Sequence, residues 1–145
     1  MKLTEDQIKK IHDYFAKQKD VVAVYLYGSF AYGNPHKDSD IDMAVLFDGK
    51  VNLYDRLGRL YGDFPKIGIR AEPEIREISL DYSPVFLMNV IRGKLIYAKD
   101  EQKRIQFEVD VMNIFRDTEY LRKLKYDYMD KSFKEGTYGY KLYHN

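Results

Sequence analysis

The sequence contains no cysteine, and its 24 basic side chains almost balance its 23 acidic ones, which leaves a formal net charge of +1. Without cysteine, disulfides and thiolate metal sites are excluded. The near-neutral balance argues against extended nucleic-acid binding through a broad basic face, although a nucleotide needs only a few local charges. No apolar run approaches the roughly 20 residues that span a bilayer, and the N-terminal MKLTEDQIKK lacks the apolar region of a signal peptide. We therefore expect a cytoplasmic protein with no membrane association.

The length of 145 residues suits one domain with a real hydrophobic core. An apolar content of 45% indicates a globular chain. Because no repeat, low-complexity block or linker interrupts it, we predict a single domain over residues 1–145, with a motif-bearing core at 20–100 and a helical extension at 101–145. The 14 tyrosines and 8 phenylalanines allow two interpretations: they fill a small core, or they form a surface for a partner.

Apolar periodicity predicts that helices and strands follow one another along the chain. Thr4 can cap a first helical turn, and the β-branched and aromatic VVAVYLYG (21–28) is typical of a buried strand. We expect helices at 3–18, at 51–64, early in 83–100 and, as one long amphipathic helix, at 100–134. We expect strands at 21–28, at 40–47, at 94–97 and, bent or at a sheet edge, within 67–80. This order predicts an α/β domain with a small mixed β-sheet flanked by helices and a long C-terminal helix.

Two aspartates, Asp40 and Asp42, lie in the apolar segment DIDMAVLF (40–47). Residues i and i+2 of a strand point to the same face, so both carboxylates should project together while Ile41 and Met43 face the opposite side. Two like charges this close repel one another unless a cation bridges them. A hard divalent cation such as Mg²⁺ binds carboxylate oxygens together with phosphate oxygens and water. The pair therefore predicts a metal site.

Gly28 and Ser29 stand at the end of the preceding predicted strand. Glycine lets a phosphate approach the backbone closely. The serine hydroxyl and neighbouring N–H groups can then bind a terminal phosphate, above all if a helix begins here. A Gly-Ser pair alone, or an Asp-x-Asp alone, is more often structural. Together, in this order and bracketed by two apolar strands, they predict a triphosphate cradle beside a metal bridge.

The segment GSFAYGNPHKDSDIDM closely resembles the Gly-Ser … Asp-x-Asp motif of the nucleotidyltransferase superfamily that includes DNA polymerase β. The chain length and the wording Ser-Asp-Ile-Asp resemble its minimal nucleotidyltransferase (MNT) branch, many of whose members are antitoxins paired with HEPN-domain ribonuclease toxins. The resemblance covers roughly residues 20–100 and ends at IRGKLIY, which is similar to that branch's closing strand.

The resemblance implies a reaction. Members of the superfamily transfer a nucleoside monophosphate from a nucleoside triphosphate to a hydroxyl, using two Mg²⁺ ions held by three carboxylates. In the antitoxin branch the donor is ATP, and the acceptor is a tyrosine of the HEPN toxin, which is silenced by AMPylation. Carried over, Gly28 and Ser29 would hold the β- and γ-phosphates, and Asp40 and Asp42 would bind the metals.

The third carboxylate that the resemblance implies should lie on a strand beside the Asp-x-Asp strand. The segment AEPEIREISLD offers four acidic residues: Glu72, Glu74, Glu77 and Asp81. We favour Glu74, because apolar residues flank it and its distance from GKLIY suits the family pattern; Glu72 or Glu77 would be next. The family usually has aspartate here, so glutamate alters the metal geometry.

A second departure is Tyr32, which stands where the antitoxin branch commonly has the arginine of Gly-Ser-x-Ala-Arg-Gly. Its ring would pack in the loop, stack or hydrogen-bond in place of a contact to triphosphate. His36 and Lys37 in the same loop are lesser candidates for substrate contacts. No two histidines have metal-ligand spacing, so we expect no zinc site.

Three hypotheses follow. The first is an Mg²⁺-dependent nucleotidyltransferase that AMPylates a tyrosine of a cognate HEPN toxin. The second is a catalytically weak antitoxin that neutralises its toxin by contact, with the aromatic C-terminal helix as the docking surface. The third is an enzyme with a small-molecule or RNA acceptor, which the small size and near-neutral charge disfavour.

Overall fold

The computed structural model of the chain describes residues 3–28 and 40–136. Their contacts divide the chain into two compact units: one extends to Met112, and the other begins at Asn113. The first unit holds the β-sheet and the segments that carry the sequence motifs.

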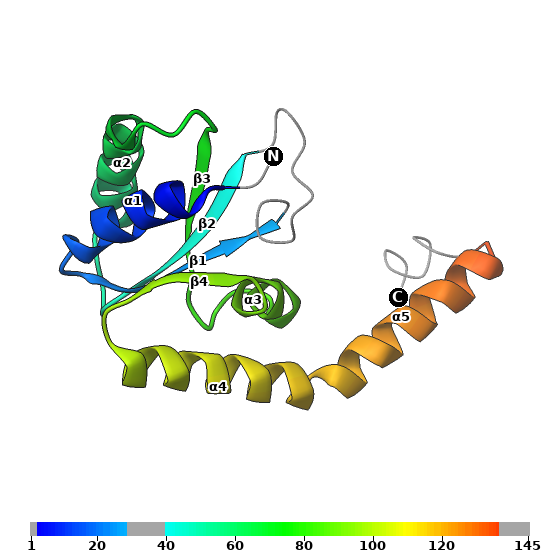
Figure 1. Cartoon of the computed structure of the whole chain (residues 1–145). Helices are drawn as coiled ribbons and strands as arrows, with labels where there is room; N and C mark the ends of the chain where they lie inside the picture. The colour runs from blue at the N-terminus through cyan, green and yellow to red at the C-terminus, as the bar shows by residue number, and fades with distance from the viewer. Residues whose placement is uncertain (1–2, 29–39, 137–145) are drawn as a thin grey trace. The chain divides into compact units, whose positions relative to one another are not determined.

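A four-stranded sheet forms the centre of the first unit (Figure 1). Its strands are β1 (Val21–Tyr27), β2 (Ile41–Phe47), β3 (Pro73–Glu77) and β4 (Lys94–Ala98), in the order β3-β2-β1-β4. β1 runs antiparallel to β2 and β4, whereas β2 and β3 are parallel. The predicted α/β fold with a small mixed sheet is therefore confirmed. β3 is an edge strand, as predicted, and Pro73 opens it, where a missing N–H is tolerated.

Helices cover both faces of this sheet (Figure 1). α1 (Glu5–Ala16), α2 (Leu53–Asp63) and the 3₁₀ turn Phe64–Ile67 contribute side chains to the core on one face. On the other face lie α3 (Pro84–Ile91) and the start of α4 (Glu101–Asp117): Phe86 of α3 contacts the ring of Tyr27, and Glu108 of α4 accepts a hydrogen bond from Tyr25.

The first helix begins as its sequence predicts. The Thr4 hydroxyl accepts a hydrogen bond from the Gln7 N–H at 3.1 Å, and the Gln7 side chain accepts one from the Thr4 N–H at 2.9 Å. This capping box satisfies two N–H groups that a helix start otherwise leaves unpaired.

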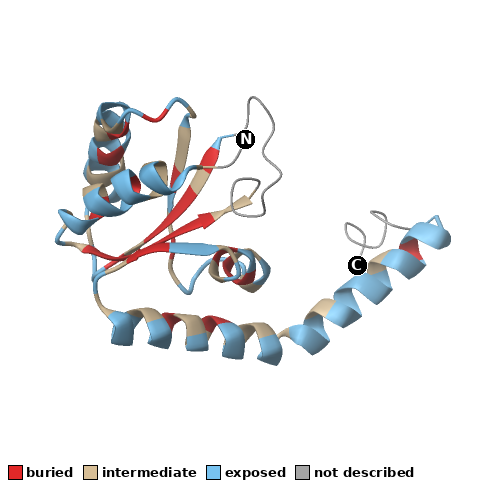
Figure 2. Cartoon of the chain, viewed as in Figure 1, coloured by how far each residue is buried: buried red, intermediate tan, exposed pale blue. Residues whose placement is uncertain are grey.

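The main core lies between the sheet and the first two helices, and Figure 2 shows buried residues concentrated on the central strands. Both faces of β1 are covered, since its first six residues are all buried. Fully buried side chains from α1, α2 and β2 complete this core: Ile11, Phe15, Leu60, Ile41, Met43 and Val45. At about 25 cal/mol per Å² of apolar surface, this burial is the main stabilising contribution to the unit.

The C-terminal segment differs from the prediction of one long helix over 100–134. α4 ends at Asp117, and a separate helix, α5, spans Glu119–Lys134. At the break, the Thr118 hydroxyl donates to the Ile114 carbonyl at 2.7 Å, and the Arg122 guanidinium donates to the Phe115 carbonyl at 2.7 Å. Side-chain bonds of this kind to carbonyls of the preceding turn compete with a continuous helical ladder.

Candidate active site

At the end of β1, a glycine lies against the carboxylate of Asp42. Gly28 has φ +73°, a conformation that L side chains rarely adopt, and a Cβ at this position would overlap Oδ2 of Asp42. Tyr27, the last residue of β1, pairs in register with Asp42 on β2. Glycine is therefore required at residue 28 on two counts, backbone conformation and the space taken by Asp42.

The strand alternation predicted for the Asp-x-Asp segment is confirmed at its apolar positions. Ile41 and Met43 are fully buried in the core. Asp42, between them, points to the other face and is half-buried. Asp40 lies one residue before β2, rather than within it, and is exposed. Its charge nevertheless helps to raise the pKa of Asp42, so the two carboxylates interact as their spacing suggested.

The parallel pairing of β2 with β3 distinguishes the acidic candidates on the third strand. Glu74 is the register partner of Asp42. Glu77 is instead the partner of Val45, and Glu72 precedes the strand. Asp81 lies beyond β3 and lines a cavity of about 380 Å³ with Gly49. The sheet therefore places Glu74, the favoured residue, directly beside Asp42.

The neighbouring carboxylates affect the pKa of Asp42. Burial raises the pKa of the Asp42 carboxyl, and repulsion from Glu74 and Asp40 raises it further, while Arg76 opposes the shift. Burial likewise raises the pKa of Tyr27 to about 12, with added repulsion from Asp42. An extra cation would be stabilised here, because it would relieve the repulsion among these groups.

Arg76 lies beside the candidate ligand Glu74, and the sequence did not lead us to predict it. Its Nη2 lies 3.3 Å from Oε1 of Glu74. Its guanidinium carbon is also 5.6 Å from the centre of the Phe86 ring. The sequence spacing could have predicted this contact, because residues 74 and 76 are two apart on a strand and must share a face.

Tyr61 of α2 fixes the edge strand that carries Glu74. The Ile75 N–H donates to the Tyr61 hydroxyl at 2.7 Å, and that hydroxyl donates to the Ile75 carbonyl at 3.3 Å. Ile75 directly follows Glu74, so this contact holds the backbone at the candidate ligand. The pairing of a helix hydroxyl with a strand far along the chain has no signature in the sequence.

Several predicted site residues lie outside the described residues: Ser29, Tyr32, His36 and Lys37. The described part of the site therefore consists of the β1 end at Gly28 and the three carboxylates Asp40, Asp42 and Glu74, with Arg76 beside them.

A family model described as Polymerase beta, Nucleotidyltransferase matches residues 9–102, well over half of the chain. The chain belongs to this nucleotidyltransferase family. The matched range contains the whole sheet and every site residue named above. No curated protein matches the sequence.

Solved structures resemble the fold of this nucleotidyltransferase. A toxin–antitoxin complex with AMP-PNP has a chain that superposes with a TM-score of 0.67 at 21% identity, covering 83% of this chain and 95% of that one. The toxin–antitoxin MntA-HepT gives a TM-score of 0.63 at 18% identity, with coverages of 86% and 97%. A complex of a tri-AMPylated Shewanella oneidensis HEPN toxin with its MNT antitoxin gives 0.62 at 19%, with coverages of 83% and 93%.

The candidate site contains the types of donor that a divalent cation prefers. Three carboxylates are hard ligands of the kind that Mg²⁺ prefers. Within residues 3–28 and 40–136, however, no three such side chains already stand close enough together to hold an ion. Glu74 is paired with Arg76 in this arrangement, so the nucleotidyltransferase would need to reorient that side chain to complete a three-carboxylate site.

None of the helices in the described part of the nucleotidyltransferase is both long enough and apolar enough to cross a membrane.

Proposed function

We propose that this protein is an Mg²⁺-dependent nucleotidyltransferase that transfers AMP from ATP to a hydroxyl, namely a tyrosine of a cognate HEPN ribonuclease toxin. One observation carries the proposal. Two carboxylates from neighbouring strands, Asp42 and Glu74, stand side by side where β1 ends at a glycine that admits no side chain.

We assign the proposed site residues to two roles, phosphate binding and metal binding. Gly28 would leave the backbone open to the β- and γ-phosphates, and the adjoining Ser29 would donate to them. Asp40, Asp42 and Glu74 would hold two Mg²⁺ ions. The chemistry that bound Mg²⁺ supplies is neutralisation of the departing pyrophosphate and activation of the acceptor hydroxyl.

The transfer is an in-line displacement. The acceptor oxygen forms a bond to the α-phosphorus while the bond from that phosphorus to the bridging oxygen breaks. Pyrophosphate leaves with the electron pair, and the hydroxyl proton passes to water. The role of the protein is to position the triphosphate against Gly28 and to hold the charges that develop.

The choice of ATP as donor and of a HEPN toxin as acceptor is supported by the similar structures. One was solved with AMP-PNP, and another contains a HEPN toxin carrying three AMP groups. Because these likenesses lie below 25% identity, they support the fold directly and the substrate only by analogy.

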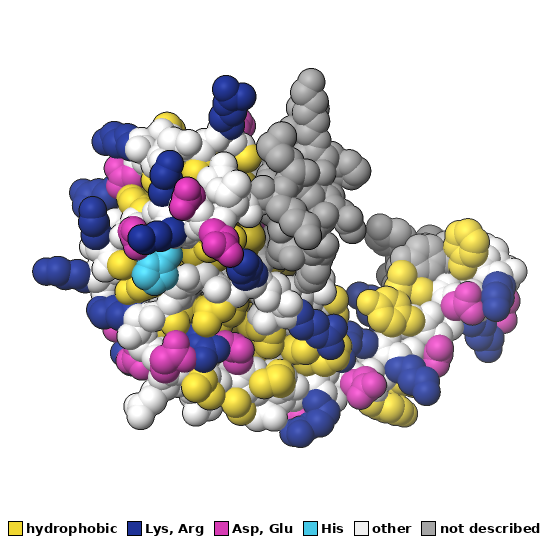
Figure 3. Space-filling view, viewed as in Figure 1, with side chains coloured by type: hydrophobic (Ala, Val, Ile, Leu, Met, Phe, Trp, Pro, Cys, Tyr) yellow, Lys and Arg dark blue, Asp and Glu magenta, His cyan; other side chains and the backbone are white. Residues whose placement is uncertain are grey.

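A contact-only antitoxin is the second candidate, and α5 is the observation that favours it. Figure 3 shows hydrophobic side chains exposed on this helix. The exposed set is Tyr120, Leu121, Leu124, Tyr126, Tyr128 and Phe133. Aromatic residues are enriched at protein interfaces, so this helix could bind a partner without any chemistry.

A labelling experiment separates the two candidates. The protein is incubated with Mg²⁺ and α-labelled ATP, with and without the product of the adjacent gene, and the same is done with the Asp40→Ala/Asp42→Ala variant. We expect label on the partner with the wild type and none with the variant. Toxin neutralisation that survives the double substitution would instead establish the contact-only antitoxin.

A further inference from the structure

Arg76 and Glu74 form an ion pair within one strand. Both belong to β3, two residues apart, so their side chains leave the sheet on the same face. The Arg76 Nε and Nη2 atoms each lie 3.3 Å from the same Glu74 oxygen, Oε1. That oxygen belongs to the carboxylate opposite Asp42, so the pair lies inside the candidate metal site.

An aromatic side chain supports the guanidinium in this position. The guanidinium carbon of Arg76 lies 5.6 Å from the centre of the Phe86 ring on α3, within the range of a cation–π contact. The Phe86 ring in turn meets Tyr27 edge-on at 5.6 Å. Arg76 is still 51% exposed, so it can move into solvent at little cost in buried area.

The charges of the candidate site do not balance. Asp40, Asp42 and Glu74 carry up to three negative charges, against the one positive charge of Arg76. A surface ion pair of this kind contributes little stability by itself, so a better cation can displace it. A divalent cation on Oε1 would also repel the guanidinium, because two positive charges this close together raise the electrostatic energy of the site.

We infer that Arg76 competes with the divalent cation for Glu74: it pairs with this carboxylate in the metal-free protein and must leave it when the cation binds. This inference rests on the proposed function, since it takes Glu74 to be a ligand. In the metal-free protein, Arg76 thereby reduces the repulsion among the carboxylates. It also lowers the affinity of the site for metal.

Binding of Mn²⁺ to the full chain tests the inference without any turnover. Titration is followed by electron paramagnetic resonance of free Mn²⁺ at low ionic strength, where the competition is least screened. We expect Arg76→Ala to tighten Mn²⁺ binding about three- to tenfold, consistent with the loss of one competing ion pair and one nearby repulsive charge. Arg76→Lys keeps the charge but loses the fork of donors, so its affinity should fall between the two.

Two comparison variants make the result specific. Arg116→Ala removes an exposed arginine that also pairs with an acidic neighbour, Asp117, and should leave Mn²⁺ affinity unchanged. Asp42→Asn should weaken binding, which shows that the titration reports the candidate site.

The outcomes separate the two claims. If binding requires Asp42 but Arg76→Ala leaves it unchanged or weaker, the competition is overturned while the metal site stands. If neither the wild type nor Arg76→Ala binds Mn²⁺, or if Asp42→Asn has no effect, the proposed metal site is overturned and the competition with it.

Discussion

The backbone of Gly28 lies directly against the carboxylate of Asp42, so closely that a Cβ at residue 28 would overlap Oδ2. This contact joins the end of β1 to the start of β2. It explains why the Gly-Ser pair and the Asp-x-Asp segment occur together: the glycine makes room for the aspartate and leaves the backbone open beside it.

Gly28→Ala should therefore impair both stability and nucleotide binding. The left-handed backbone costs about 1–2 kcal/mol for an alanine, and displacement of Asp42 adds to that cost. Gly49→Ala is the matched control, because Gly49 has φ +74° and open space around it. We expect urea unfolding to show a larger loss for Gly28→Ala, and calorimetry to show weaker ATP binding for that variant alone. Equal losses in the two variants would contradict the proposed contact.

Tyr61→Phe should loosen the edge strand at Glu74. The substitution removes the hydroxyl that binds both the N–H and the carbonyl of Ile75, at an expected cost of about 1–2 kcal/mol. Hydrogen exchange of the Ile75 amide should become faster. Tyr54→Phe, on the same helix but at a side chain that is 90% exposed, should change neither quantity. An Ile75 amide that stays as protected as in the wild type would contradict this role.

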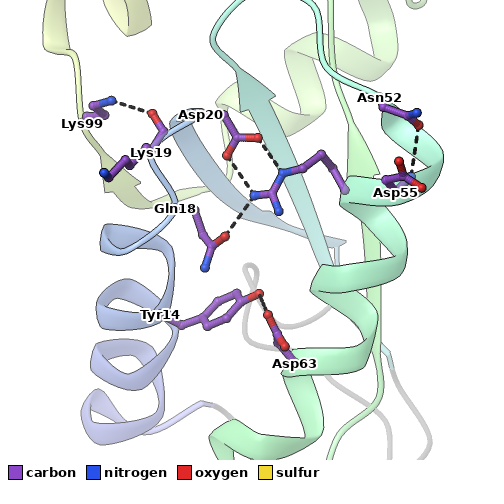
Figure 4. Close-up of polar contacts among 9 residues, drawn as sticks. Tyr14, Gln18, Lys19, Asp20, Asn52, Asp55, Asp63 and Lys99 are labelled. Atoms are coloured by element: carbon purple, nitrogen blue, oxygen red, sulfur yellow. Dashed lines mark hydrogen bonds and ion pairs between the residues drawn. The ribbon is translucent and has the colours of Figure 1, made fainter.

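Gln18 and Asp20, in the turn between α1 and β1, both point toward α2 (Figure 4). Arg56 of α2 donates hydrogen bonds to both of these side chains. It donates to both Asp20 carboxylate oxygens, at 2.5 and 2.8 Å, and the pair is largely shielded from water. Arg56→Ala should lower the free energy of unfolding by about 1–3 kcal/mol. Lys66→Ala removes an exposed pair with Asp63 at 3.8 Å and should cost less than about 0.5 kcal/mol. Similar losses from the two substitutions, measured by chemical denaturation, would rule out a special role for Arg56.

The raised pKa of Asp42 predicts a pH-dependent penalty in the metal-free protein. Between the ordinary carboxyl pKa and the raised folded value, the folded state holds a proton that the unfolded state has lost, so stability falls as pH rises through this range. Asp42→Asn lacks that penalty. With chelator present, the variant should be more stable than the wild type at pH 7, and the advantage should shrink towards pH 4. An advantage that grows as the pH falls would contradict the assignment.

Much of the site could be predicted from the sequence because it depends on local rules. The alternation in DIDMAVLF placed Ile41 and Met43 in the core and Asp42 on the opposite face. The β-branched run before Gly28 marked the end of a buried strand. These features follow from strand geometry alone.

Features that depend on distant segments were harder to predict. Glu74 could only be favoured over its acidic neighbours, because the register between β2 and β3 depends on how α2 returns the chain to the sheet. The break at Thr118 has neither proline nor glycine, and it depends on hydrogen bonds from Thr118 and Arg122. Arg76 was missed because its partner was considered only as a metal ligand.

The rate of AMP transfer by Glu74→Gln, compared with Glu77→Gln, tests the central claim most directly. Glu74→Gln keeps the shape of the side chain but removes its charge, at the position that lies in register with Asp42. Glu77→Gln makes the same change on the same strand, at the position in register with Val45. We predict that Glu74→Gln slows label transfer from α-labelled ATP to the partner about 100-fold or more, because a metal-holding carboxylate contributes several kcal/mol to the transition state. Glu77→Gln should retain the wild-type rate. Transfer at the wild-type rate by Glu74→Gln would contradict the account.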